Sequence, residues 1–290
     1  GAVFEVVDPE GATVGTFATN SRGEIVIPLT MAGNYTVYER TAPQGYLLSE
    51  EPAKNVSIVY GEQSTLTFEN DPYGTLEVRK YSNTGMALAG AVIQIEHIES
   101  GATYTEETGS AGVAIFDELP PGAYRIVEIE SPDGYLKDET VYTKTVISGD
   151  TVSIPIVNKE KPGLRILKYD SKTQKALPDI TFEVFKDGQS IGQYKTDQFG
   201  EILLTDLEPG TYLVKEVATD ESHIINSTPQ QIELEGGDGI LQLIFFNAQK
   251  PGIHLIKLDA TSLKPLPNAT FRIEQVGGTF SKEYVTDENG

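Results

Sequence analysis

The chain has 290 residues, no cysteine and a formal net charge of −21, from 22 Lys plus Arg against 43 Asp plus Glu. The lack of cysteine excludes a disulfide framework and any thiolate metal site or nucleophile. A chain this acidic repels phosphate backbones and anionic lipid surfaces, so we expect no nucleic-acid partner and no membrane partner. Hydrophobic residues make up 39% and aromatic residues 9%, which is enough to bury real cores and excludes wholesale disorder.

The sequence repeats itself with a period of 88 or 89 residues. Three short apolar segments recur at this spacing, and each ends in the same polar residue every time. The glutamates are Glu39, Glu128 and Glu216, the asparagines are Asn70, Asn158 and Asn247, and the lysines are Lys80, Lys168 and Lys257. Three landmarks with one period indicate a tandem array, and a period of this length suits a small self-contained domain rather than a solenoid repeat.

The period divides the chain into four units. We expect complete repeats at residues 73–161 and 162–250. Residues 1–72 would be a repeat that lacks its first, lysine-bearing strand, and residues 251–290 the N-terminal part of a fourth. The junctions are only a few residues long, which predicts a semi-rigid line of neighbours. The expected assembly is a monomeric rod whose repeats have their neighbours in the same chain as partners.

Within each unit the pattern predicts strands. Short β-branched or aromatic runs alternate with turn signals, and no segment has a sustained helical period with a cap. In chain order the strand-like runs used below are 35–39, 66–70, 76–80, 124–128, 154–158, 164–168, 212–216, 243–247 and 253–257. We interpret the Gly236–Gly239 run as a hairpin loop. Many short strands in units of this size predict an all-β fold, a tandem array of small Ig-like β-sandwich domains.

Each complete repeat places three polar residues in phase with its core-facing residues. In a strand, residues two apart share a face, so Lys80 lies in line with Leu76 and Val78. Glu128 and Asn158 end apolar stripes in the same way, as do Lys168, Glu216 and Asn247 in the next repeat. A lone buried charge or amide is costly, so we expect the three groups of a repeat to meet.

Two interpretations fit this recurrence. Each polar residue could simply end its stripe at the solvent edge, or Lys and Glu could form a buried ion pair, but an ion pair leaves the asparagine unexplained. The second interpretation is chemical: burial lowers a lysine pKa and raises a glutamate pKa, so a neutral amine can attack the side-chain amide carbon of Asn. The Glu would move protons to the departing ammonia. The product is a Lys–Asn isopeptide bond, formed in a single self-directed turnover rather than by an enzyme acting on a substrate.

The glutamate segments also carry a family resemblance. The pattern Tyr-x-x-x-Glu-x-x-Ala-Pro-x-Gly-Tyr at Tyr35–Tyr46, with a near copy at Tyr124–Tyr135, resembles the glutamate box of Gram-positive surface proteins and pilins. Together with the lysine and asparagine strands, it makes the units similar to the B-type repeats of the collagen adhesin (CnaB, or SpaA-like, domains). The resemblance implies a prealbumin-like sandwich, intramolecular isopeptide bonds, and a stalk role on a wall-anchored, extracellular bacterial surface protein.

The resemblance also assigns roles by position. The cross-links would join Lys80 to Asn158 and Lys168 to Asn247, with Glu128 and Glu216 as proton shuttles. Glu39, Asn70 and Lys257 belong to incomplete triads. A lysine strand offered in trans could complement the first repeat, an interpretation that we rank below a simple sequence boundary. The third repeat departs from the pattern, because Ala218–His223 replaces the expected Ala-Pro-x-Gly-Tyr and puts that loop in doubt.

Other site chemistries have little support. The three histidines, His97, His223 and His254, show no metal-ligand spacing, and no cofactor fingerprint or nucleophile elbow occurs. We therefore expect no metal and no cofactor. The favoured function is a structural stalk segment of a cell-surface adhesin, which would reach the host extracellular matrix through a head domain elsewhere. The alternatives are repeats that bind a matrix protein or glycan directly, or an accessory array on a secreted polysaccharide-active enzyme.

Overall fold

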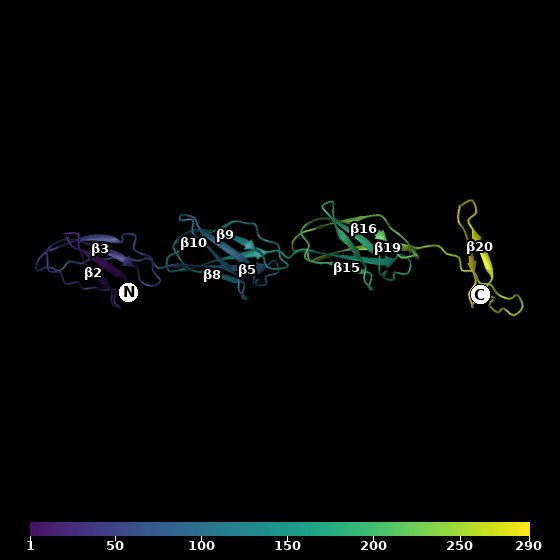
Figure 1. Cartoon of the computed structure of the whole chain (residues 1–290), viewed down its shortest axis with the longest axis horizontal. Helices are drawn as coiled ribbons and strands as arrows, with labels where there is room; N and C mark the ends of the chain where they lie inside the picture. Colours follow the sequence, from purple (N-terminus) through teal and green to yellow (C-terminus); the bar gives the residue numbers. More distant parts are fainter.

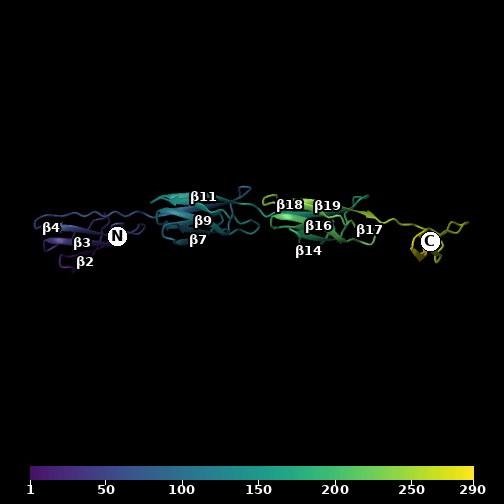
Figure 2. The same ribbon diagram turned by 90° about the horizontal axis from the view of Figure 1, so that it is seen from above.

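The computed structural model describes residues 1–290, and its regular elements are all strands. Four bodies follow one another along the long axis, the fourth after a longer extended segment (Figure 1). Seen from above, they keep to one row (Figure 2). The all-β prediction is confirmed. The structure contains no helix that is long and apolar enough to cross a membrane.

The first body has a single antiparallel sheet of order β2-β1-β3-β4. Its strands are β1 (Val3–Val7), β2 (Thr13–Ala18), β3 (Gly33–Thr41) and β4 (Ala53–Ile58). Residues 24–29 and 64–70 run along this sheet without strand pairing of their own. By repeat position these two segments match strands of the second sheet in the later bodies. The second sheet of the expected sandwich is therefore not formed in this body.

The second body is a complete two-sheet sandwich. Its strands are β5 (Gly74–Ser82), β6 (Val92–His97), β7 (Thr103–Glu107), β8 (Val113–Leu119), β9 (Gly122–Glu130), β10 (Tyr142–Val146) and β11 (Thr151–Asn158). One sheet has the order β10-β9-β6-β7 and the other β11-β5-β8. The lysine strand β5 is central in its sheet, parallel to β11 and antiparallel to β8. A core of 12 buried residues fills the space between the sheets.

The third body has the same architecture. Its strands are β12 (Gly163–Asp170), β13 (Thr181–Lys186), β14 (Gln189–Lys195), β15 (Glu201–Leu204), β16 (Gly210–Ala218), β17 (His223–Ile224), β18 (Gln230–Leu234) and β19 (Ile240–Gln249). The sheets are β15-β12-β19-β17 and β14-β13-β16-β18. The hairpin expected at Gly236–Gly239 is wrong, because β18 and β19 belong to different sheets and this loop crosses between them.

The fourth body is a hairpin of β20 (Thr270–Glu274) and β21 (Ser281–Val285). Residues 251–257, which carry the expected fourth lysine strand, form no strand and are exposed. The Lys257 amide donates to the Gly290 carbonyl at 2.6 Å, but no strand pairs with this apolar segment.

Contacts cross the junction between the second and third bodies. The Gly237 amide donates to the Glu160 carbonyl at 2.8 Å, and Lys161 forms an ion pair with Glu208 at 2.8 Å. The loop between β18 and β19 thereby contacts the linker from the third body. From the second body, the Leu136 amide donates to the Lys159 carbonyl at 2.8 Å, so the linker is held from both sides.

Candidate cross-linking site

The second body brings Lys80, Glu128 and Asn158 together between its two sheets. Alternation along β5 turns Lys80 inward with Leu76 and Val78, while its outward neighbours remain partly or fully exposed. In the parallel pair of β5 and β11, Lys80 lies opposite Ile156, so Asn158 comes two residues further on the same face. Glu128 reaches the site from β9 in the facing sheet.

The three side chains form one hydrogen-bonded group. Glu128 accepts hydrogen bonds from Asn158 Nδ2 at 2.8 Å and from the Asp138 amide at 2.7 Å, and its carboxylate lies 3.1 Å from Lys80 Nζ. Lys80 Nζ also donates to Asn158 Oδ1. Lys80 is 0%, Glu128 3% and Asn158 1% exposed, so water is excluded from all three. The amine therefore lies beside the amide in a dry site.

Burial shifts the pKa of the amine in both complete repeats. Desolvation lowers the pKa of Lys80, and the nearby Glu128 carboxylate opposes this shift only in part. The pKa of Lys168 is lowered for the same reason, against the opposing effect of Glu216. A lysine with a lowered pKa has a larger neutral fraction near pH 7, and the neutral amine is the nucleophilic form.

The third body builds the same group from β12, β16 and β19. Lys168 Nζ donates to Glu216 at 2.9 Å and to Asn247 Oδ1 at 2.6 Å, while Asn247 Nδ2 donates to Glu216 at 2.6 Å. All three side chains are buried. The sequence pattern selected one Lys, one Glu and one Asn in each complete repeat. The structure brings these three side chains together in the same arrangement in both repeats.

The first body holds the pair without the amine. Asn70 Nδ2 donates to the buried Glu39 carboxylate at 2.9 Å and to the Leu47 carbonyl at 2.9 Å. A cavity of about 460 Å³ opens beside them, lined by Asn70 and by apolar side chains that include Phe4 and Phe68. The predicted Lys257 contacts no such pair, since the segment that carries it forms no strand and is exposed.

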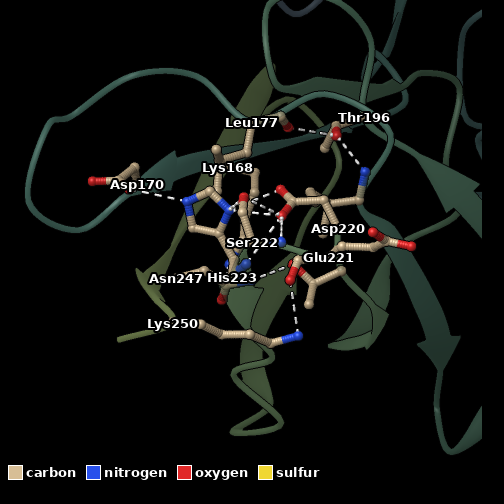
Figure 3. Close-up of polar contacts among 12 residues, drawn as sticks. Lys168, Asp170, Leu177, Thr196, Asp220, Glu221, Ser222, His223, Asn247 and Lys250 are labelled. Carbon is tan, nitrogen blue, oxygen red and sulfur yellow. Dashed lines mark hydrogen bonds and ion pairs between the residues drawn. The ribbon is translucent and has the colours of Figure 1, made fainter. Parts of the chain in front are cut away.

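Several contacts at the third site were missed by sequence reasoning. The Thr219 hydroxyl accepts a second hydrogen bond from Asn247 Nδ2, at 2.9 Å. Nearby, the His223 ring lies between the carboxylates of Asp170 and Asp220 (Figure 3). The available signal was the departure of residues 218–223 from the glutamate-box pattern, which marked the loop but not its contacts. The structure places no group of three or more His, Cys, Asp or Glu side chains where it could hold a metal ion.

A family model for the SpaA prealbumin-like fold domain matches the sequence three times, at residues 1–72, 74–160 and 162–247. The chain belongs to this family. The predicted family resemblance is therefore confirmed, and with it the prealbumin-like form of each sandwich. The sequence matches no curated protein.

Solved structures similar to this SpaA-family chain match it at low sequence identity and low TM-score. The Bacillus anthracis TIE protein is 22% identical with a TM-score of 0.37, and the match covers 99% of this chain but only 57% of that protein. The minor pilin GBS52 of Streptococcus agalactiae is 17% identical, with a TM-score of 0.33 and coverage of 63% and 99%. The shaft pilin SpaA of Lactobacillus rhamnosus GG is 13% identical, with a TM-score of 0.40 and coverage of 63% and 100%.

Proposed function

We propose that the chain is a stalk segment of a Gram-positive cell-surface protein, in which each complete repeat is closed by a Lys–Asn isopeptide bond. The observation that carries the proposal is the pair of dry Lys–Glu–Asn groups, each with amine, amide and carboxylate within hydrogen-bonding distance. Membership of the SpaA family supports the surface role. A host-matrix contact would belong to a head domain outside residues 1–290.

The chemistry follows from the contacts in the second repeat. The neutral Lys80 Nζ attacks Asn158 Cγ, a new C–N bond forms, and the bond from Cγ to Nδ2 breaks. Glu128, within hydrogen-bonding distance of both nitrogens, takes the proton that Nζ loses and delivers it to Nδ2, which leaves as ammonia. The atoms balance as amine plus amide giving substituted amide plus ammonia. The site reacts once with its own chain and turns over no substrate.

The position of the bond gives it a mechanical use. Lys80 and Asn158 are 78 residues apart in sequence and lie on adjacent parallel strands at the start and end of the repeat. A tension that enters along β5 and leaves along β11 would pass through the covalent link and bypass the hydrogen-bonded core. A cysteine-free surface protein would thus have a staple that resists stretching without a disulfide.

Single-molecule stretching of residues 1–290 tests this role. Asn158→Ala removes the electrophile yet leaves the Lys80–Glu128 ion pair in place. This variant should release about 260 to 280 Å more chain than the parent when the second repeat yields, because 78 residues become extensible at 3.3–3.6 Å each. Asn247→Ala is the matched control and should release a similar length from the third repeat alone. A parent chain that already releases both lengths contradicts the proposal.

A further inference from the structure

The loop that follows the glutamate strand is built differently in the third repeat. In the second repeat this loop has Pro132, and a turn is closed by the Tyr135 amide, which donates to the Pro132 carbonyl at 3.1 Å. The first repeat makes the same turn between Tyr46 and Pro43, also at 3.1 Å. Proline fixes the backbone angle φ and so stiffens such a loop. The third repeat has no proline here.

Asp220 and His223 occupy the positions of that proline and tyrosine. The Asp220 carboxylate accepts hydrogen bonds from the Ser222 amide at 2.7 Å and the His223 amide at 3.0 Å, so a side chain closes the turn in place of a carbonyl. The same carboxylate lies 2.8 Å from His223 Nδ1. Local hydrogen bonds thus replace the stiffness that proline gives to the other two loops.

His223 also ties the loop to the lysine strand. Its Nε2 lies 3.0 Å from a carboxylate oxygen of Asp170, which ends β12 two residues after Lys168. Figure 3 shows Asp170 and Asp220 on opposite sides of the imidazole ring. Asp170 is 1% and His223 6% exposed. We call Asp170, His223 and Asp220 the histidine clasp. The second repeat has Ser82 at the Asp170 position and Tyr135 at the His223 position, so it has no clasp.

The clasp holds the loop beside the reacting amide. Thr219 directly precedes Asp220, and its hydroxyl accepts a hydrogen bond from Asn247 Nδ2, the nitrogen that leaves in the proposed reaction. The corresponding residue of the second repeat, Ser131, turns its hydroxyl to the Tyr135 carbonyl at 3.1 Å instead. A hydroxyl can both accept and donate hydrogen bonds. Thr219 can therefore accept from the planar amide and donate to the lone pair that this nitrogen gains as its bond to Cγ breaks.

We propose that Thr219 is a further catalytic residue of the third repeat, and that the histidine clasp positions it. The inference rests on the proposed cross-link between Lys168 and Asn247. The bonds made and broken stay as in the second repeat. Lys168 Nζ bonds to Asn247 Cγ, Glu216 carries the proton from Nζ to Nδ2, and ammonia departs past the Thr219 hydroxyl.

The clasp makes the third cross-link sensitive to pH. Ionised carboxylates only accept hydrogen bonds, so both ring contacts of His223 are hydrogen bonds only while both of its nitrogens carry protons. The charged groups that face the ring are Asp220 from its own loop and Asp170 from β12. From the end of β19, Lys250 directs its ammonium to the Glu221 carbonyl at 3.0 Å. As the pH rises and the ring loses a proton, one contact is lost and the loop is released from one side.

The test compares both cross-links in one sample. Chain recovered unreacted in denaturant is diluted into refolding buffer, quenched with acid at timed intervals and digested, and the two cross-linked peptides are quantified by mass spectrometry. Thr219→Val should slow the third bond by about threefold to tenfold relative to the second, the equivalent of one neutral hydrogen bond. Thr219→Ser should restore most of the rate. Ser131→Ala, the matched change in the second repeat, should leave the Lys80–Asn158 bond unaffected. Hydrogen exchange of β19 amides checks that each variant folds.

The pH profile tests the clasp separately from folding. Between about pH 5 and about pH 8, where histidine titrates, the rate of the third bond divided by that of the second should fall as pH rises. His223→Gln should give a low ratio that does not vary with pH. An unchanged rate in Thr219→Val, or a parent ratio independent of pH, overturns this inference while the cross-links stand. Absence of both bonds from the parent overturns the proposed function and this inference with it.

Discussion

The first and second repeats hold the same glutamate–asparagine pair, but only the second has a lysine strand. Asn158 is buried, whereas Asn70 is half-buried. In the second repeat β5 lies between β11 and β8, and the core around it is closed. In the first repeat the equivalent segments, residues 24–29 and 64–70, lack strand pairing and flank a cavity of about 460 Å³. Glu39 and Asn70 nevertheless keep their hydrogen bonds.

This difference separates two roles of the lysine strand. The glutamate–asparagine pair assembles without it, so the electrophile and the proton shuttle are organised by the facing sheet and the loop. The lysine strand supplies the nucleophile and also pairs with the strands on both of its sides. The strand that carries the amine is thus also the central strand of its sheet. The amine reaches the amide only when this strand has paired, so bond formation is coupled to completion of the fold.

Among the changes considered, loss of the cross-link should have the largest effect on the stability of a repeat. Glu128→Gln removes the proton shuttle with little change in shape, so the second bond should fail to form. The bond would close a segment of 78 residues, and by analogy with a disulfide its loss should lower the unfolding free energy of the second repeat by about 4 to 5 kcal/mol. Calorimetry of the whole chain measures this. Glu216→Gln should destabilise the third repeat instead, and an equal loss of stability in both repeats from either variant would contradict the account.

Core truncation should give the next largest effect. Phe245 of the third repeat and Phe68 of the first occupy matching positions, with ring centroids 4.9 Å from Phe182 and 4.8 Å from Phe4. Phe245 is 1% exposed, so Phe245→Ala should cost about 3 to 5 kcal/mol. Phe68 is only partly buried beside the cavity, so Phe68→Ala should cost clearly less. Chemical denaturation followed repeat by repeat would show this, and equal costs would mean that the first core is as closed as the third.

The smallest effect should come from pH. Burial lowers the pKa of His223, but hydrogen bonds to Asp220 and Asp170 outweigh it, and the net shift is upward from 6.5. A raised pKa adds stability that is complete below about pH 6.5 and lost as the pH rises through the folded value. The third repeat should therefore lose stability towards alkaline pH through this loop, whereas the second, with Tyr135 there, should not. An NMR titration should show the His223 pKa falling in Asp170→Asn. An unaltered His223 pKa in that variant would show that Asp170 does not interact with the His223 ring.

The sequence was most informative where a period could be counted. Alternation along β5 and β11 indicates that Lys80 and Asn158 face the core, and the repeat spacing pairs them with Glu128. The parallel pairing of β5 with β11 could not be derived in this way, because alternation defines faces and not neighbours. The same limit explains the wrong hairpin at Gly236–Gly239, where a glycine-rich turn signal was compatible with a crossover between sheets.

The contacts of the third loop lay beyond any local pattern. Asp170 and His223 are 53 residues apart, and nothing in either segment indicates that their side chains meet. Thr219 reads as an ordinary loop residue until Asn247 is placed beside it. The departure from the Ala-Pro-x-Gly-Tyr pattern identified the loop in which the repeats differ. The contacts by which Asp220 and His223 replace the missing proline depend on the folded structure and could not be predicted from this loop alone.

The most direct test of the central claim is the mass of the intact chain. If both complete repeats close their bonds, residues 1–290 should be lighter than the sequence mass by two molecules of ammonia, and digestion should yield one peptide pair containing Lys80 with Asn158 and another containing Lys168 with Asn247. Lys80→Ala should restore one ammonia and leave the third repeat cross-linked. A parent chain with the full sequence mass would contradict the account and leave two buried, unreacted polar groups.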